Sequence, residues 1–158
     1  MTLNEILLEK LANWRPAGRQ TFHVAGEGSA WSAGVTADCV DLVGCRLWEL
    51  TLRRNGAALD VAALKERAGR VAERVTGLLE PLKLVEVDEP RRVALLRSEA
   101  PGQRGDDLFY YETLLHRDGT VEFRRFQGSH QPGSRRQQVE FTLTHDALAK
   151  LVADLTAE

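Results

Sequence analysis

The side chains best suited to molecular recognition are concentrated between residues 109 and 136, where aromatic and arginine residues are interleaved. Aromatic rings can stack on nucleobases while guanidinium groups pair with phosphates, so this composition is compatible with binding of RNA or single-stranded DNA. The same residue types are enriched at the centres of protein–protein interfaces. The segment contains Tyr110, Tyr111, Phe123, Phe126, Arg117, Arg124, Arg125, Arg135 and Arg136.

A tight turn would place these residues on two adjacent strands. The Asp-Gly dipeptide at 118–119 is typical of a two-residue type I′ hairpin turn, because both residues tolerate positive φ angles. Such a turn aligns Glu112 with Arg125 on one face of the hairpin and Tyr111 with Phe126 on the other. A Glu–Arg pair neutralises charge that phosphate binding would need, and the glycine and spaced aromatics of an RNP motif are missing. The pattern therefore favours a protein interface or ordinary strand pairing over nucleic-acid binding.

A different chemistry is suggested by segment 30–34, Ala-Trp-Ser-Ala-Gly, which loosely matches the nucleophile elbow of serine hydrolases. Ser32, Asp106 and His130 occur in the chain order that those hydrolases use. The elbow requires a strand before the serine, a helix after it and a parallel sheet, and the surrounding pattern predicts no such combination. A small serine hydrolase centred on Ser32 is therefore an alternative hypothesis to a binding module.

Other motifs give no reason to expect a metal or a cofactor. The four histidines are scattered, and the sequence contains no Cys-x-x-Cys, His-x-His or His-Glu-x-x-His motif. The glycines at 26 and 28 match only the start of a dinucleotide fingerprint, because Trp31 occupies the third glycine position. Acidic clusters at 86–89 and 106–107 are typical of turns. The sequence predicts no catalytic residue, no metal ligand and no cofactor.

Length and composition predict one globular domain over residues 1–158. A chain of 158 residues with 43% hydrophobic and 28% charged residues can bury a core without a disulfide or a metal. The 21 basic and 23 acidic residues give a net charge of −2, so no overall field steers the chain toward nucleic acid or anionic lipid. No apolar run approaches the roughly 18 residues of a membrane span. The N-terminus carries no secretory pattern, so we expect a cytoplasmic protein that does not bind membranes.

Capping residues and periodicity predict three helices. Thr2, Asp60 and Thr144 are typical N-cap residues, and each precedes apolar residues at helical spacing. The first helix covers residues 3–13. The central helix follows Asp60 and is ended by Pro81, and the last helix follows Thr144.

Alternating patterns between these helices predict strands joined by short connections, which favours antiparallel pairing. The expected elements are a hairpin within 22–34, alternation over 40–54 interrupted near Gly44, strands at 82–87, 92–97, 108–117, 120–127 and 139–143, and a surface loop at 98–107. The sequence thus predicts an α+β domain with a mainly antiparallel sheet of about six to eight strands, with N-terminal, central and C-terminal helices packed largely on one face.

The sheet face without helices is the predicted functional surface. Covering it with a second copy would remove apolar surface from water, so we expect a homodimer. A different protein partner and a nucleic acid are the alternatives. The residues expected at the interface are Tyr110, Glu112, Arg124, Arg125, Phe126, Arg135 and Arg136.

Overall fold

A computed structural model describes residues 1–56 and 58–157 and confirms the α+β class. The helices are α1 (Leu3–Asn13), α2 (Val61–Arg74) and α3 (His145–Thr156). The strands are β1 (Gln20–Ala25), β2 (Trp31–Val40), β3 (Gly44–Arg54), β4 (Leu82–Asp88), β5 (Val93–Ser98), β6 (Gly102–Arg104), β7 (Asp107–His116), β8 (Val121–Ser129), β9 (Gln137–Val139) and β10 (Phe141–Thr144). All helices begin where the capping residues predicted.

Each helix starts at a side chain that satisfies a backbone amide. The Thr2 hydroxyl accepts from the Glu5 amide at 3.2 Å, and the Glu5 carboxylate accepts from the Thr2 amide at 2.9 Å. Asp60 and Thr144 accept from amides three residues further along, at 2.8 and 3.0 Å. The prediction that α2 continues to Pro81 is wrong, because the helix ends at Arg74. Val75 and Leu78 are buried in the irregular segment that follows.

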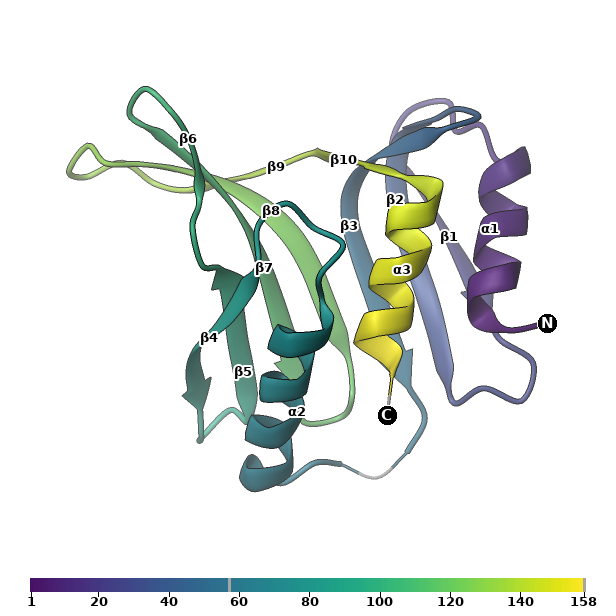
Figure 1. Cartoon of the computed structure of the whole chain (residues 1–158), viewed down its shortest axis with the longest axis horizontal. Helices are drawn as coiled ribbons and strands as arrows, with labels where there is room; N and C mark the ends of the chain where they lie inside the picture. The colour runs from purple at the N-terminus through teal and green to yellow at the C-terminus, as the bar shows by residue number, and fades with distance from the viewer. Residues whose placement is uncertain (57, 158) are drawn as a thin grey trace.

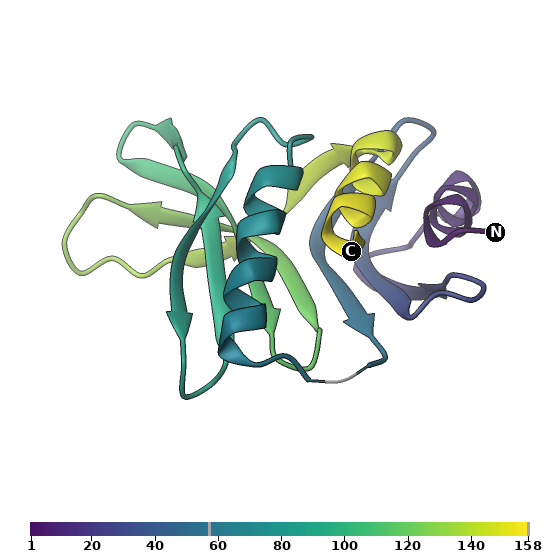
Figure 2. The same cartoon turned by 60° about the horizontal axis from the view of Figure 1, so that its bottom comes forward.

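The strands form one antiparallel sheet in the order β1-β2-β3-β8-β7-β5-β4, and the described residues contain ten strands in all. Figures 1 and 2 show the three helices on the same side of this sheet. Helix α1 contacts β1 and β2, α3 contacts β3 and β10, and α2 contacts β4, β5 and β7. The predicted arrangement of helices on one face is confirmed, and none of the three helices in the described ranges lies on the opposite face.

The core lies between the helices and the sheet. Because side chains alternate across a strand, one row of each strand points toward the helices. The fully buried side chains include Leu7, Leu11, Val35, Leu47, Leu50, Leu52, Leu64, Leu96, Leu115, Phe123, Leu148 and Leu155. Phe123 is central, with ring centroids 5.2 Å from Tyr111 and 5.6 Å from Phe141.

Two segments of the C-terminal half, residues 98–107 and 139–143, differ from the prediction. The segment 98–107 contains β6, which forms a hairpin with β7. The single strand predicted at 139–143 is two short strands, of which β9 pairs with β8 and β10 pairs with β3. Strand β3 is joined to β8 only at Leu50–Leu52, and its first residues pair with β10 instead.

The β7–β8 turn also differs from the prediction, by one residue. The His116 amide donates to the Thr120 carbonyl at 2.9 Å, so the loop contains three residues, and Gly119 adopts a φ of 92°. Three-residue loops with glycine at the positive-φ position are a common hairpin class. The register is therefore Glu112 with Arg124 and Tyr110 with Phe126. The predicted pairings of Glu112 with Arg125 and of Tyr111 with Phe126 are wrong.

Among the described residues, no helix is both long enough and apolar enough to cross a bilayer.

Candidate functional site

The helix-free side of the sheet, here called the open face, gathers most of the predicted interface residues. Tyr111, Thr113, Leu115 and Phe123 point into the core. Their neighbours along β7 and β8 must therefore project from the opposite face. Tyr110, Glu112, Arg124 and Phe126 lie on this face, and Arg136 reaches it from the segment before β9.

The centre of the open face is an aromatic pair flanked by arginines. The Tyr110 and Phe126 rings are stacked, with centroids 6.0 Å apart and planes inclined by 27°. The Arg136 guanidinium lies 3.9 Å from the Phe126 centroid, and the Arg97 guanidinium lies 5.4 Å from the Tyr110 centroid. Arg136 also donates to the Tyr110 hydroxyl at 3.5 Å. Each ring of the stacked pair therefore has a cation–π contact with one arginine.

Glu112 connects those two arginines. Its side chain is 6% exposed and accepts from Arg97 Nε at 3.1 Å. It also accepts two hydrogen bonds from Arg136, the second of them at 3.4 Å. Hydrogen bonding to Glu112 raises the pKa of the Arg136 guanidinium. We call Arg97, Tyr110, Glu112, Phe126 and Arg136 the open-face cluster.

A second ion-pair network adjoins the cluster toward β3. Arg124 donates to Glu49 at 2.9 Å and to Glu122 at 2.8 Å, and Glu122 lies 2.7 Å from His116 Nε2. Burial raises the pKa of Glu122, but the hydrogen bond to His116 and the positive charge of Arg124 together lower it below its ordinary value. The open face thus places three arginines against three glutamates.

Two predicted interface residues are elsewhere. Arg125 projects to the helix side of β8, where it makes two hydrogen bonds to Glu80, at 2.9 and 3.3 Å, and its guanidinium lies 4.3 Å from the Tyr111 ring. The three-residue turn explains this, because it moves Arg125 opposite Tyr111 rather than Glu112. Arg135 is exposed in the β8–β9 connection and lines a shallow hollow with Asp107 and Gln127.

The prediction omitted residues that complete the networks. Arg97 lies opposite Glu112 on β5, and Glu49 reaches Arg124 from β3. Alternation within β5 predicts that Arg97 lies on a sheet face. Its contact with Glu112 depends on the pairing of β5 with β7, which the sequence pattern does not give. His116 and Glu122 lie in the same hairpin, and they become neighbours on one face only in the observed register.

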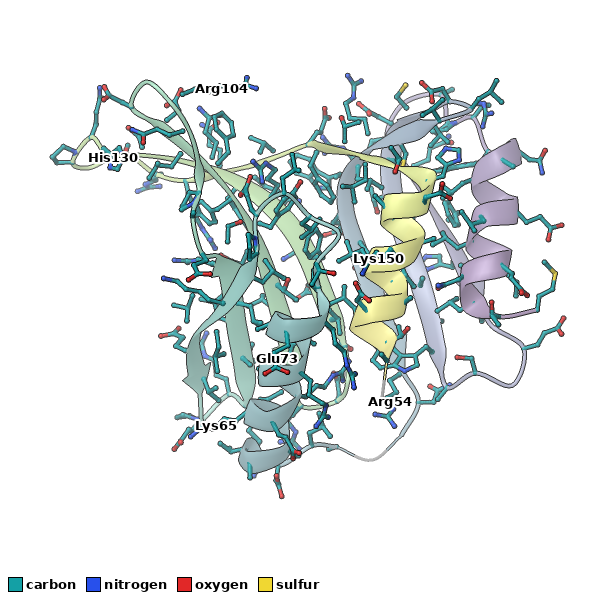
Figure 3. All side chains as sticks on the ribbon, in the orientation of Figure 1. Arg54, Lys65, Glu73, Arg104, His130 and Lys150 are labelled. Atoms are coloured by element: carbon teal, nitrogen blue, oxygen red, sulfur yellow. The ribbon has the colours of Figure 1, made fainter. Side chains whose placement is uncertain are left out.

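The residues of the hydrolase hypothesis are not brought together. Ser32 pairs with Arg53 near the end of β3. The His130 amide donates to the Asp106 carbonyl at 3.1 Å, at the tip of the β6–β7 and β8–β9 region. Figure 3 labels His130 at the upper left of the molecule and Arg54, the residue after Arg53, at its lower edge. Within the described part of the chain, no group of three or more His, Cys, Asp or Glu residues is placed to hold a metal ion.

The chain was compared with protein-family models, curated proteins and solved structures. No match was found.

Proposed function

We propose that this protein is a non-enzymatic interaction module that forms a homodimer through its open face. The observation that carries the proposal is the open-face cluster, in which stacked Tyr110 and Phe126 are held by arginines that share Glu112. Aromatic and arginine side chains supply much of the binding energy in protein interfaces. Here they are already ordered by the sheet and by each other, which lowers the entropy lost on binding.

The balance of charge favours a second copy as the partner. In a two-fold symmetric interface the same surface meets itself, so a face of a single sign would repel its copy. The arginines at 97, 124 and 136 are matched by the glutamates at 49, 112 and 122. Half-buried aromatic rings between these pairs provide apolar surface that a partner would cover.

The same pairing weakens the nucleic-acid alternative. A phosphate would have to compete with Glu112 for Arg136 and with Glu49 and Glu122 for Arg124. Binding through counterion release requires arginines that gain a phosphate without losing a carboxylate. The nucleic-acid hypothesis predicts retention on RNA or single-stranded DNA that decreases steeply with salt, whereas the dimer proposal predicts none.

Light scattering of the purified protein at low and high salt tests the proposal. We expect twice the chain mass of 17.6 kDa, without co-purifying nucleic acid. Phe126→Ser removes an aromatic anchor from the open face and should shift the equilibrium toward the monomer. Leu42→Ser is the matched control, because Leu42 is exposed in the turn between β2 and β3. A wild-type protein that stays monomeric at high concentration contradicts the proposal, as does equal dissociation of both variants.

A further inference from the structure

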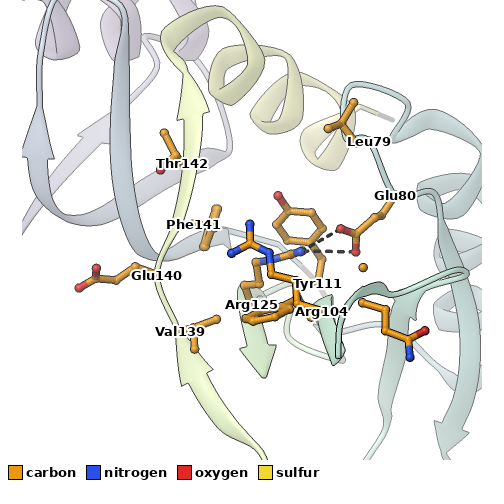
Figure 4. A pocket seen from close by; sticks show the side chains of 12 residues that line it. Leu79, Glu80, Arg104, Tyr111, Arg125, Val139, Glu140, Phe141 and Thr142 are labelled. Atoms are coloured by element: carbon orange, nitrogen blue, oxygen red, sulfur yellow. Dashed lines mark hydrogen bonds and ion pairs between the residues drawn. The ribbon is translucent and has the colours of Figure 1, made fainter. Parts of the chain in front are cut away.

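One pocket lies on the helix side of the sheet, away from the open face. Its volume is about 490 Å³, within the range of small-molecule sites. It is bounded by the segment after α2, by the β6–β7 hairpin and by the β9–β10 segment (Figure 4). Apolar side chains supply much of its wall, namely Leu79, Phe109, Tyr111, Val139 and Phe141.

An ion pair lies at the bottom of this pocket. Arg125 and Glu80 are each 15% exposed and are joined by two hydrogen bonds, which Figure 4 marks with dashed lines. The guanidinium also stacks on Tyr111, with 4.3 Å to the ring centroid. Replacing a buried ion pair with apolar residues is often neutral or stabilising, so this pair is weakly explained by stability alone.

Charge in the pocket is predominantly positive. Arg104 also lines it, stands 5.7 Å from the Phe109 centroid, and has no carboxylate within ion-pair distance among the described residues. Glu140 is a lining residue, but its carboxylate points away from Arg125 in Figure 4 and pairs with Arg19 and Arg46. Two guanidinium groups therefore face the cavity against the single carboxylate of Glu80.

Leu79 gives a second indication that the pocket is incomplete. Its side chain is 100% exposed at the pocket rim, although it is large and apolar. A ligand with an apolar body would cover Leu79 and the aromatic wall, and a negative group would meet the excess positive charge.

We propose that this pocket binds a small apolar carboxylate, whose hydrocarbon body contacts Leu79, Phe109 and Phe141 and whose carboxylate is bound by Arg104, while Arg125 stays paired with Glu80. The site lies on the opposite side of the sheet from the open face. The proposal is independent of dimerisation, and either can fail without the other.

Octanoate is a suitable probe, with octanol as its uncharged counterpart, and amide chemical shifts in ¹H–¹⁵N NMR spectra locate the binding. We expect octanoate to shift residues 102–111, 125 and 139–142 in a saturable manner, and octanol to bind at least about fivefold more weakly. Equal shifts with both probes, or shifts concentrated on the open face, would overturn the proposal.

Three variants should change the affinity for octanoate in different ways. Arg104→Gln should weaken octanoate binding about fivefold, the size expected for an exposed ion pair. Glu80→Gln releases Arg125 from its carboxylate and should strengthen binding about fivefold, an effect that a purely structural role of Glu80 would not produce. Arg91→Gln is the control. It removes one positive charge, as Arg104→Gln does, but in the β4–β5 turn, which is remote from the pocket. Unchanged affinity in both Arg104→Gln and Glu80→Gln would refute the assignment.

The pocket can also be narrowed without altering its charges. A Cβ added at Gly102 would meet Glu80 Oε2 at 3.6 Å and Arg125 Nη2 at 3.7 Å, which are ordinary contacts. Gly102→Leu should therefore occupy part of the cavity and weaken the octanoate shifts. A folded Gly102→Leu protein that binds octanoate like the wild type would contradict the site.

Discussion

Substitution of Glu112 by glutamine tests whether the open-face cluster is held together by its central carboxylate. The wild-type carboxylate is 6% exposed and accepts charged hydrogen bonds from Arg97 and Arg136. Each of these two ion pairs contributes about 1–1.5 kcal/mol net when the cations are partly exposed, as they are here. Glu112→Gln should therefore lower the free energy of unfolding by about 2–3 kcal/mol, and the melting temperature by about 6 °C.

The corresponding arginine variant should have a smaller effect. Arg136→Gln leaves Glu112 paired with Arg97 and should lower the free energy of unfolding by about 1 kcal/mol. In the double variant the two losses should not add, giving a coupling energy of about 1 kcal/mol.

Urea unfolding at one fixed protein concentration measures these values, because dimerisation would add a concentration-dependent contribution. The control is Arg91→Gln, which removes a guanidinium that is 83% exposed and lies 3.8 Å from Asp88. That change should alter stability by less than about 0.5 kcal/mol. A Glu112→Gln effect no larger than that of the control, or additive losses in the double variant, would refute the reasoning.

Three further predictions concern single groups. Iodoacetamide at about pH 8 should alkylate exposed Cys39 and spare Cys45, whose pKa burial raises to about 12; peptide mapping showing equal labelling in the folded protein would contradict this. The pKa of Glu122 is lower in the folded protein than its ordinary 4.5, so its stabilisation is complete above that value and is lost as the pH falls below it. The loss of urea stability between about pH 6 and pH 3 should therefore be smaller in Glu122→Gln, and an unchanged loss would argue against the ion pairs. Gly119→Ala should lower the free energy of unfolding by about 1–2 kcal/mol in the same urea assay, because φ is 92° and the new Cβ would lie 3.0 Å from Arg54 Cβ; an unchanged midpoint would refute this.

Local signals in the sequence predicted the elements better than they predicted the site. Capping by Thr2, Asp60 and Thr144 depends on neighbouring residues only, and all three helix starts are correct. The register of the β7–β8 hairpin depends on whether its loop has two residues or three. An Asp-Gly dipeptide is compatible with both, so the predicted register was one residue off.

That single residue decided which arginine belongs to the open face. A shift of one position moves a side chain to the other side of a strand, so Arg124 occupies the face on which Arg125 was expected. The contacts of Glu112 with Arg97 and of Arg125 with Glu80 depend on strand order and on the path after α2. These contacts join segments separated by 15 and 45 residues, which periodicity and turn signals do not relate.

The division of β3 between two partners bears on the order in which the chain can fold. Strand β3 meets β8 at only three residue pairs, and its first residues are completed by β10, which immediately precedes the last helix. The bond from Cys45 Sγ to the Leu143 carbonyl spans 98 residues. Contacts between such distant positions slow folding, because a long loop must close before they form. During synthesis, the first residues of β3 therefore stay unpaired on one side until β10 has left the ribosome.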